Sequence, residues 1–86
     1  MPSTLNPTPA RWTERQGQYL AFIHDYTKVN RQPPAETDIA RFFGLAPPSV
    51  HRMIVELAER GLLAKIPGAA RSLRVLVPRA DLPELE

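Results

Sequence analysis

The residues of this chain that could carry out chemistry are few, and their spacing does not fit a catalytic or metal site. His24 and Asp25 are adjacent, so on a helix their side chains point about 100° apart and do not converge on one atom. His51 has Ile54 and Val55 three and four residues further on, where a second metal ligand would stand. The sequence has no cysteine and only 4 glycines, which excludes thiol chemistry and a glycine-rich phosphate loop. We therefore expect no enzyme, no metal and no cofactor.

The basic residues, in contrast, are concentrated in one part of the chain. The 86 residues include 11 lysines and arginines and 9 acids, which gives a net charge of +2. Three of the acids lie in the last six residues, whereas no acid occurs between residues 60 and 79. A stretch with charges of one sign attracts polyanions such as nucleic acids. Its bases are Arg60, Lys65, Arg71, Arg74 and Arg79.

The length and composition indicate one small domain with a segment at each end. A chain of this size has core for three or four elements. Residues 1–10 and 78–86 are rich in proline and poor in large apolar residues, so neither buries enough surface to order itself. We expect a disordered N-terminal tail at 1–10, a folded domain at 11–77 and a proline-rich, acidic C-terminal tail at 78–86. With no signal pattern and no apolar run near the roughly 20 residues of a membrane span, we expect a cytoplasmic protein.

The first predicted helix covers residues 13 to about 29. Thr13 and Gln16 have the spacing of a capping box, in which each side chain accepts a hydrogen bond from the other residue's free amide. The stiff Pro33-Pro34 pair forces extended backbone, so the helix ends near Asn30. One wide face is apolar and the other faces solvent. The predicted solvent face consists of Glu14, Gln18, Ala21, Asp25 and Lys28.

Two shorter helices follow. One fits residues 36–43, with Gly44 as a left-handed stop, and Ala35 gives it no capping oxygen. The other begins near Pro48 and ends before Gly61. The turn between them is short, as in a helix-turn-helix. Four aromatic residues stand at core spacing on the first two helices: Tyr19, Phe22, Phe42 and Phe43.

After Gly61 the pattern becomes that of β-strands. Residues 62–66 and 72–77 form two β-rich segments, separated by a loop that contains Gly68. The predicted fold is mainly α with a small β-hairpin, a winged helix-turn-helix of three helices plus a two-stranded antiparallel wing. Because a lone hairpin is marginal in water, its apolar residues must close over the helices. These residues are Leu63, Ile66, Leu73 and Val75.

The order of several short motifs carries a family resemblance. The motifs are Thr13-Glu14-Arg15-Gln16, Pro33-Pro34, Asp38-Ile39-Ala40, Gly44-Leu45, Ser49-Val50-His51-Arg52, Leu57 with Gly61-Leu62, and Pro67-Gly68-Ala69-Ala70-Arg71 with Leu73-Arg74-Val75. Over residues 12–77 the chain resembles the DNA-binding domain of the LexA repressor family. The resemblance implies that the third helix enters the major groove and the wing meets the DNA backbone. Because the family's self-cleaving, dimerising peptidase domain has no counterpart here, we expect no self-cleavage.

The third helix supplies the candidate base contacts. Only the first turns of a recognition helix reach base edges. Arg52 is the strongest candidate, since its guanidinium can donate twice to guanine O6 and N7. His51 contacts a base or phosphate, or packs beside the first helix, and Ser49 bonds a phosphate or caps its own helix. The expected base contacts, which also align with the family's contact positions, are Pro48, Ser49, His51 and Arg52.

The wing and the start of the second helix supply candidate backbone contacts. Arg71 lies at or just after the tip of the loop. Contacts of this kind set affinity and register and carry no sequence information. Bases on the wing have an alternative role, because they discourage pairing between exposed strand edges. The expected backbone contacts are Thr37, Lys65, Arg71 and Arg74.

Two functions from different classes are consistent with the sequence. The first is a small, nucleoid-associated LexA-like regulator, a repressor, which binds duplex DNA and takes no small-molecule ligand. One module buries only roughly 600 to 1,000 Å² on DNA, which favours a homodimer on two half-sites. The alternative is a winged-helix module for protein–protein interaction with no DNA target. The modest net charge, the acidic end and the missing helix caps favour this alternative.

Overall fold

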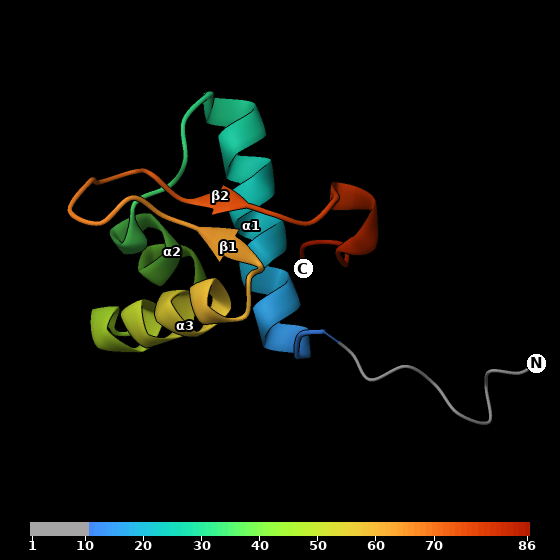
Figure 1. Ribbon diagram of the computed structural model, residues 1–86, viewed down its shortest axis with the longest axis horizontal. Helices are drawn as coiled ribbons and strands as arrows, with labels where there is room; N and C mark the ends of the chain where they lie inside the picture. The colour runs from blue at the N-terminus through green and yellow to red at the C-terminus, as the bar shows by residue number, and fades with distance from the viewer. Residues whose placement is uncertain (1–10) are drawn as a thin grey trace, which may run out of the picture.

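The computed structural model describes residues 11–86 and has three helices packed against a two-stranded antiparallel sheet (Figure 1). The expected disordered tail at 1–10 lies outside the described residues. The arrangement confirms the predicted winged helix-turn-helix. In chain order the elements are α1 (Glu14–Asn30), α2 (Glu36–Phe43), α3 (Pro47–Glu59), β1 (Leu63–Ala64), β2 (Arg74–Val75) and a short 3-10 helix (Arg79–Asp81).

Both ends of α1 are fixed by local hydrogen bonds. At its start the Thr13 hydroxyl accepts from the Gln16 amide at 3.1 Å, and the Gln16 side-chain oxygen accepts from the Thr13 amide at 2.9 Å. The predicted capping box is therefore confirmed. At the other end Arg31 adopts a left-handed conformation with φ of 61° and donates its amide to the Thr27 carbonyl. These bonds satisfy backbone groups that a helix end otherwise leaves free.

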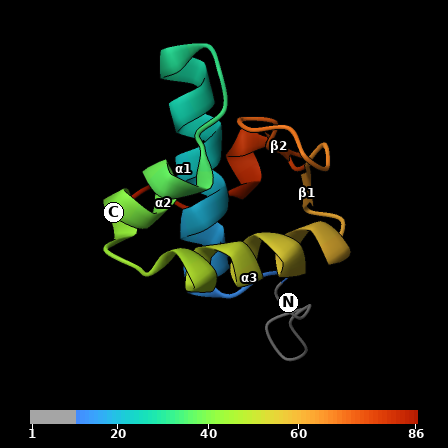
Figure 2. The same cartoon turned by 90° about the vertical axis from the view of Figure 1, so that its left-hand side faces the viewer.

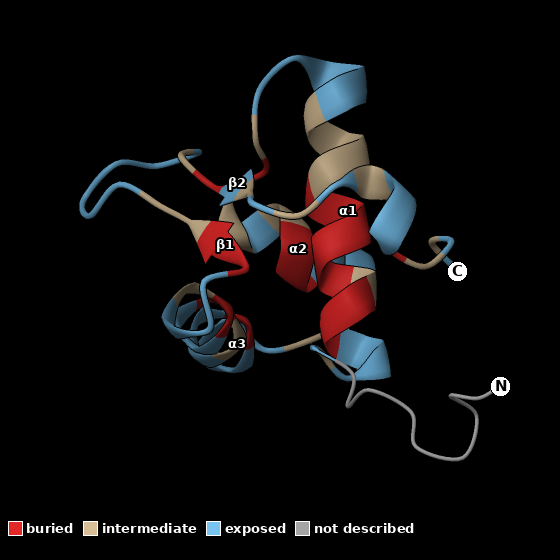
Figure 3. Ribbon diagram, turned by 45° about the vertical axis from the view of Figure 1, so that its right-hand side comes forward, coloured by how far each residue is buried: buried red, intermediate tan, exposed pale blue. Residues whose placement is uncertain are grey.

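The core forms where α2, α3 and the sheet meet the first half of α1 (Figure 3). α3 contributes the stripe Val50, Ile54 and Leu57, each with no exposed surface. Strand β1 pairs with β2 so that Leu63 lies opposite Val75, and Leu63 closes the core from above α3. The buried hydrophobic residues outside these are Tyr19, Leu20, Ala21, Phe22, Ile23, Ile39, Ala40, Leu62, Leu73 and Leu82.

The C-terminal segment, residues 78–86, differs from the expected unordered tail. It turns back along α1, contains the 3-10 helix and buries Leu82 (Figure 1). Arg79 donates to both carboxylate oxygens of Asp25, at 2.9 and 3.2 Å. The Gln18 side chain donates to the Glu84 carbonyl and accepts from the Glu86 amide. Composition did not predict this segment because polar hydrogen bonds, rather than a long apolar run, hold it in place.

The same contacts correct the prediction for the outer face of α1. Gln18, Ala21 and Asp25 were assigned to solvent, yet Ala21 has no exposed surface. Gln18 and Asp25 both bond the C-terminal segment, which therefore covers this face of the helix. Gly17 lets the chain approach closely here, since a Cβ at that position would lie 3.1 Å from the Pro83 ring.

The element boundaries in the helix-turn-helix and wing also differ from those predicted. α3 begins at Pro47, one residue before the predicted start, because neither proline of its first turn has an N–H group that would need a hydrogen-bond acceptor. The strands are only two residues long. Ile66 does not join the apolar face and is 63% exposed, because its amide turns to the Ser72 hydroxyl at 2.9 Å.

Phe42 lies at the edge of the core and not inside it. Its side chain is 48% exposed, and its ring stacks on Phe22 with centroids 4.4 Å apart. The buried residues of α2 are Ile39 and Ala40, whereas its last two residues contact the aromatic side chains of α1 from the edge. Phe43 is partly buried and stacks on Tyr19 at 4.7 Å.

Leu82→Ala tests whether the C-terminal segment belongs to the folded unit. The substitution removes a buried side chain, so we expect urea unfolding to show a loss of about 2 kcal/mol in the free energy of unfolding. Leu76→Ala is the matched control, because Leu76 is 45% exposed and its truncation should cost under about 0.5 kcal/mol. If Leu82→Ala cost as little as Leu76→Ala, the segment would contribute nothing to stability.

The ion pair between Asp25 and Arg79 makes a pH-dependent contribution. The hydrogen bond from Arg79 lowers the pKa of Asp25 below its ordinary value of 3.8. A carboxyl with a lowered folded pKa stabilises the protein above its unfolded pKa and loses this effect as the pH falls through the folded value. We expect Asp25→Asn to lower the free energy of unfolding by up to about 1 kcal/mol at pH 7. The loss is small because the pair is partly exposed to solvent. In urea unfolding the difference should shrink toward zero as the pH falls from 3.8 through the lowered pKa of Asp25, and a constant difference would contradict this assignment.

Candidate nucleic-acid interface

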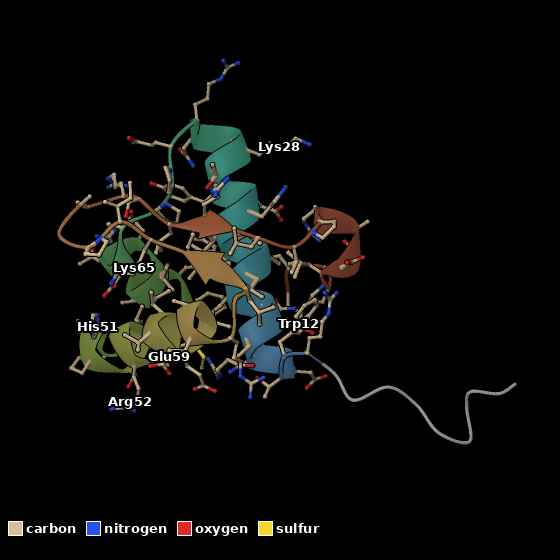
Figure 4. The ribbon with its side chains drawn as sticks, viewed as in Figure 1. Trp12, Lys28, His51, Arg52, Glu59 and Lys65 are labelled. Carbon is tan, nitrogen blue, oxygen red and sulfur yellow. The ribbon has the colours of Figure 1, made fainter. Side chains whose placement is uncertain are left out.

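The first half of α3 projects the predicted base contacts into solvent. Pro48, Ser49, His51 and Arg52 are all exposed, and the opposite face of the helix holds the buried core stripe. α3 lies along one side of the molecule, crossing below α1 (Figure 2). Arg52 points away from the body of the protein, and His51 lies at the exposed end of α3 (Figure 4). The structure therefore places the four residues together on one accessible surface.

The turn before α3 fixes how this helix starts. Gly44 adopts φ of 67°, and its successor Leu45 donates its amide to the Ala40 carbonyl at 3.0 Å. A left-handed residue at this point ends α2 and redirects the chain within a few residues. Ala46 is the N-cap of α3 and provides no side-chain hydrogen bond.

Glu36, at the start of α2, lies close to His51 and Lys65, two residues that are predicted to contact DNA. The His51 Nδ1 atom lies 3.2 Å from one of its carboxylate oxygens, and the Lys65 Nζ atom lies 3.9 Å from the other. Lys65 and His51 stand on the same side of the molecule in Figure 4. His51 therefore packs beside α2, and not beside α1 as the alternative assignment had it. An acid at the centre of this basic surface was not anticipated from the sequence.

The wing loop, residues 66–72, is closed by one serine. The Ser72 hydroxyl accepts from the Ile66 amide at 2.9 Å and lies 3.1 Å from the Ala69 carbonyl. The Ala69 amide in turn donates to the Ile66 carbonyl, and Gly68 takes φ of 77° at the bend. These bonds hold the loop in a defined turn that extends past α2 (Figure 1).

The Arg71 side chain extends from this loop toward α1 and α2. Arg71 has φ of 53°, which is unusual for a residue with a side chain. Its Nη1 atom donates to the Asp38 carboxylate at 2.9 Å and lies 3.3 Å from both the Tyr26 hydroxyl and the Pro33 carbonyl. Sequence reasoning placed Arg71 correctly near the end of the loop, but it missed these three partners.

Asp38 joins the wing to the start of α2. The oxygen that accepts from Arg71 also accepts from the Ala35 amide at 2.9 Å, so Asp38 bonds the N-cap amide of α2, although Ala35 has no side-chain oxygen for the amides of the first turn. The Ala35 amide and the Arg71 guanidinium together keep the pKa of Asp38 below its usual value. A sequence signal for this existed, because an acid three residues after an N-cap is the reciprocal half of a capping box.

The other predicted backbone contacts are exposed or at the edge of the site. Thr37 is exposed in the first turn of α2, between Glu36 and Asp38, and Arg74 is exposed on β2. Within residues 11–86, neither Arg52 nor Arg74 forms an ion pair, whereas Lys65 does. The surface thus combines free arginines with bases held by acids of α2.

The described residues contain no cluster of acids and histidines able to hold a metal ion, and no helix among them is long and apolar enough to cross a membrane. Compared with known protein families, the chain matches the family described as LexA DNA binding domain over residues 10–72. The matched region runs from just before α1 to the end of the wing loop. It therefore includes the whole helix-turn-helix and the residues that Arg71 contacts.

Proposed function

The chain belongs to the LexA DNA-binding domain family, and on this basis we propose that it is a small transcriptional repressor that binds a specific duplex sequence. In this proposal α3 enters the major groove and the wing lies along the DNA backbone. The observation that carries it is the exposed first half of α3, where Arg52 has no ion-pair partner within residues 11–86. An exposed guanidinium without an ion-pair partner is available for two hydrogen bonds to guanine.

Affinity would come from the residues around this helix. In this proposal the phosphate contacts are made by Arg74 on β2, Lys65 at the base of the wing and Thr37 at the start of α2. Such contacts position the protein and make binding depend on salt, because each neutralised phosphate releases counterions. One copy offers few of them, so we further propose a homodimer that binds two half-sites on chromosomal DNA in the cytoplasm.

The experiment that tests the proposal is selection of duplexes from random and genomic pools, followed by affinity measurements across a salt series. We expect an enriched palindrome and a slope of log affinity against log salt equal to several released counterions. A nearly flat slope with no enriched sequence would overturn the proposal and favour a protein–protein interaction module.

Arg52 should determine specificity more than affinity. Arg52→Ala should cost about 1 to 3 kcal/mol on the selected site, because it removes both hydrogen bonds to one base. Arg52→Lys keeps the charge but not the planar pair of donors, so it should retain binding to random duplex and lose discrimination at one base position. Competition between the selected site and single-base variants measures this. Unchanged discrimination by Arg52→Lys would remove Arg52 from the base contacts.

Glu36 should weaken DNA binding, since its carboxylate lies beside His51 and Lys65 where phosphates would approach. Glu36→Gln removes the repulsion and releases Lys65, so we expect affinity to rise roughly two- to tenfold at low salt. Glu59→Gln is the control, because it changes the net charge equally at the last residue of α3 (Figure 4). An equal gain for both variants would show that only net charge matters.

A further inference from the structure

We propose that Arg71 is a positioning residue, which fixes the wing against the start of α2 through Asp38 and does not itself contact DNA. The inference deepens the proposed function and rests on it only for its effect on DNA binding. It assigns to Arg71 a role different from the backbone contact that its place in the loop suggests.

The argument begins with the partners of one nitrogen. The Arg71 Nη1 atom lies within hydrogen-bond distance of acceptors on three separate segments: the Tyr26 hydroxyl on α1, the Pro33 carbonyl before α2, and the Asp38 carboxylate on α2. Three acceptors around one charged donor make a specific, directional anchor. The wing loop is thereby attached to α1, to the segment before α2, and to α2, the first helix of the helix-turn-helix.

The receiving side of this anchor is held rigidly. The Asp38 side chain is only 15% exposed, and the oxygen facing Arg71 also accepts from the Ala35 amide. Asp38 belongs to α2, whose Ile39 and Ala40 lie in the core. Movement of the carboxylate toward solvent would therefore uncap α2 as well as release the wing.

The backbone of Arg71 also favours this geometry. Arg71 holds a left-handed backbone conformation with φ of 53°, which L-residues adopt only at a cost in free energy. Next to it, Ser72 closes the loop through its bonds to Ile66 and Ala69. The strained backbone thus turns the guanidinium toward α2 while the rest of the loop keeps its own hydrogen bonds.

A phosphate contact that took the Nη1 atom of Arg71 would compete with this anchor. The atom that bonds Asp38 is the atom that bonds Tyr26 and Pro33, so swinging it to DNA would break all three contacts. Arg74, in contrast, is exposed on β2 and forms no ion pair within residues 11–86. The wing therefore divides its arginines between positioning and phosphate binding.

The first test uses the DNA-free protein, so it does not depend on the proposed function. Hydrogen exchange at the Ile66 and Ala69 amides reports on the loop, because both amides donate within it. We expect Arg71→Ala and Asp38→Ala each to speed this exchange roughly tenfold, and the double variant no further, since either substitution already breaks the contact that joins Arg71 to Asp38. Arg74→Ala should change it less than about twofold. Exchange in the middle of α1 verifies that each variant is folded.

The second test measures DNA binding by the same variants. If Arg71 positions the wing, Arg71→Ala lowers affinity and leaves the salt slope unchanged, whereas Arg74→Ala lowers the slope by about 0.9. Asp38→Ala is the most discriminating variant, because removal of an acid strengthens DNA binding unless the acid is needed to hold the wing. We expect it to weaken binding, opposite to Glu36→Gln.

Two results would overturn the inference. One is loop exchange that Arg71→Ala leaves unchanged. The other is a slope lowered by Arg71→Ala together with tighter binding by Asp38→Ala, which would make Arg71 a phosphate contact. Failure of the parent to bind any duplex would instead reject the proposed function, and the exchange measurements would still decide whether Arg71 anchors the wing.

Discussion

The burial of the first half of α1 on every side is the constraint on which the rest of this small structure depends. Of the eight residues from 16 to 23, all but Gln18 are buried. A helix this fully enclosed needs a partner on each face, and a chain of 86 residues has few to offer. α2 packs on one side through Phe43, β2 contacts a second, and the C-terminal segment covers a third. α3 is joined to it by the Gln16 side chain, which donates to Glu56 at 2.9 Å.

Much of this fold could be predicted from local sequence, because the signals act within a few residues. The capping box at Thr13, the left-handed stop at Gly44 and the buried stripe of α3 all depend on short-range spacing. The order of three helices and a hairpin follows from them. The C-terminal segment did not follow, because its contacts join residues more than fifty positions apart, as Arg79 and Asp25 do. Glutamine and aspartate on a helix face indicate solvent unless the partner is known.

The site shows the same division between local and distant information. Exposure of Arg52 and its neighbours could be predicted, since the opposite face of α3 is apolar. What the bases contact could not be predicted, because the acids that hold Lys65 and Arg71 lie on α2. Two acids in the first turn of that helix are also favourable for its dipole, which is a sufficient local reason for their presence. Only the fold shows that they also organise the wing.

The place where the chain leaves the fold has a consequence for protein engineering. Glu86 lies beside α1, where its amide donates to the Gln18 side chain, and the C-terminus is on the other side of α1 from the wing loop in Figure 1. A fluorescent protein or dimerising module fused there would leave free the surface that we propose binds DNA. A chimera that takes this module into another protein should be joined after residue 86. A junction after residue 77 would leave Gln18 and Asp25 of α1 without their bonding partners.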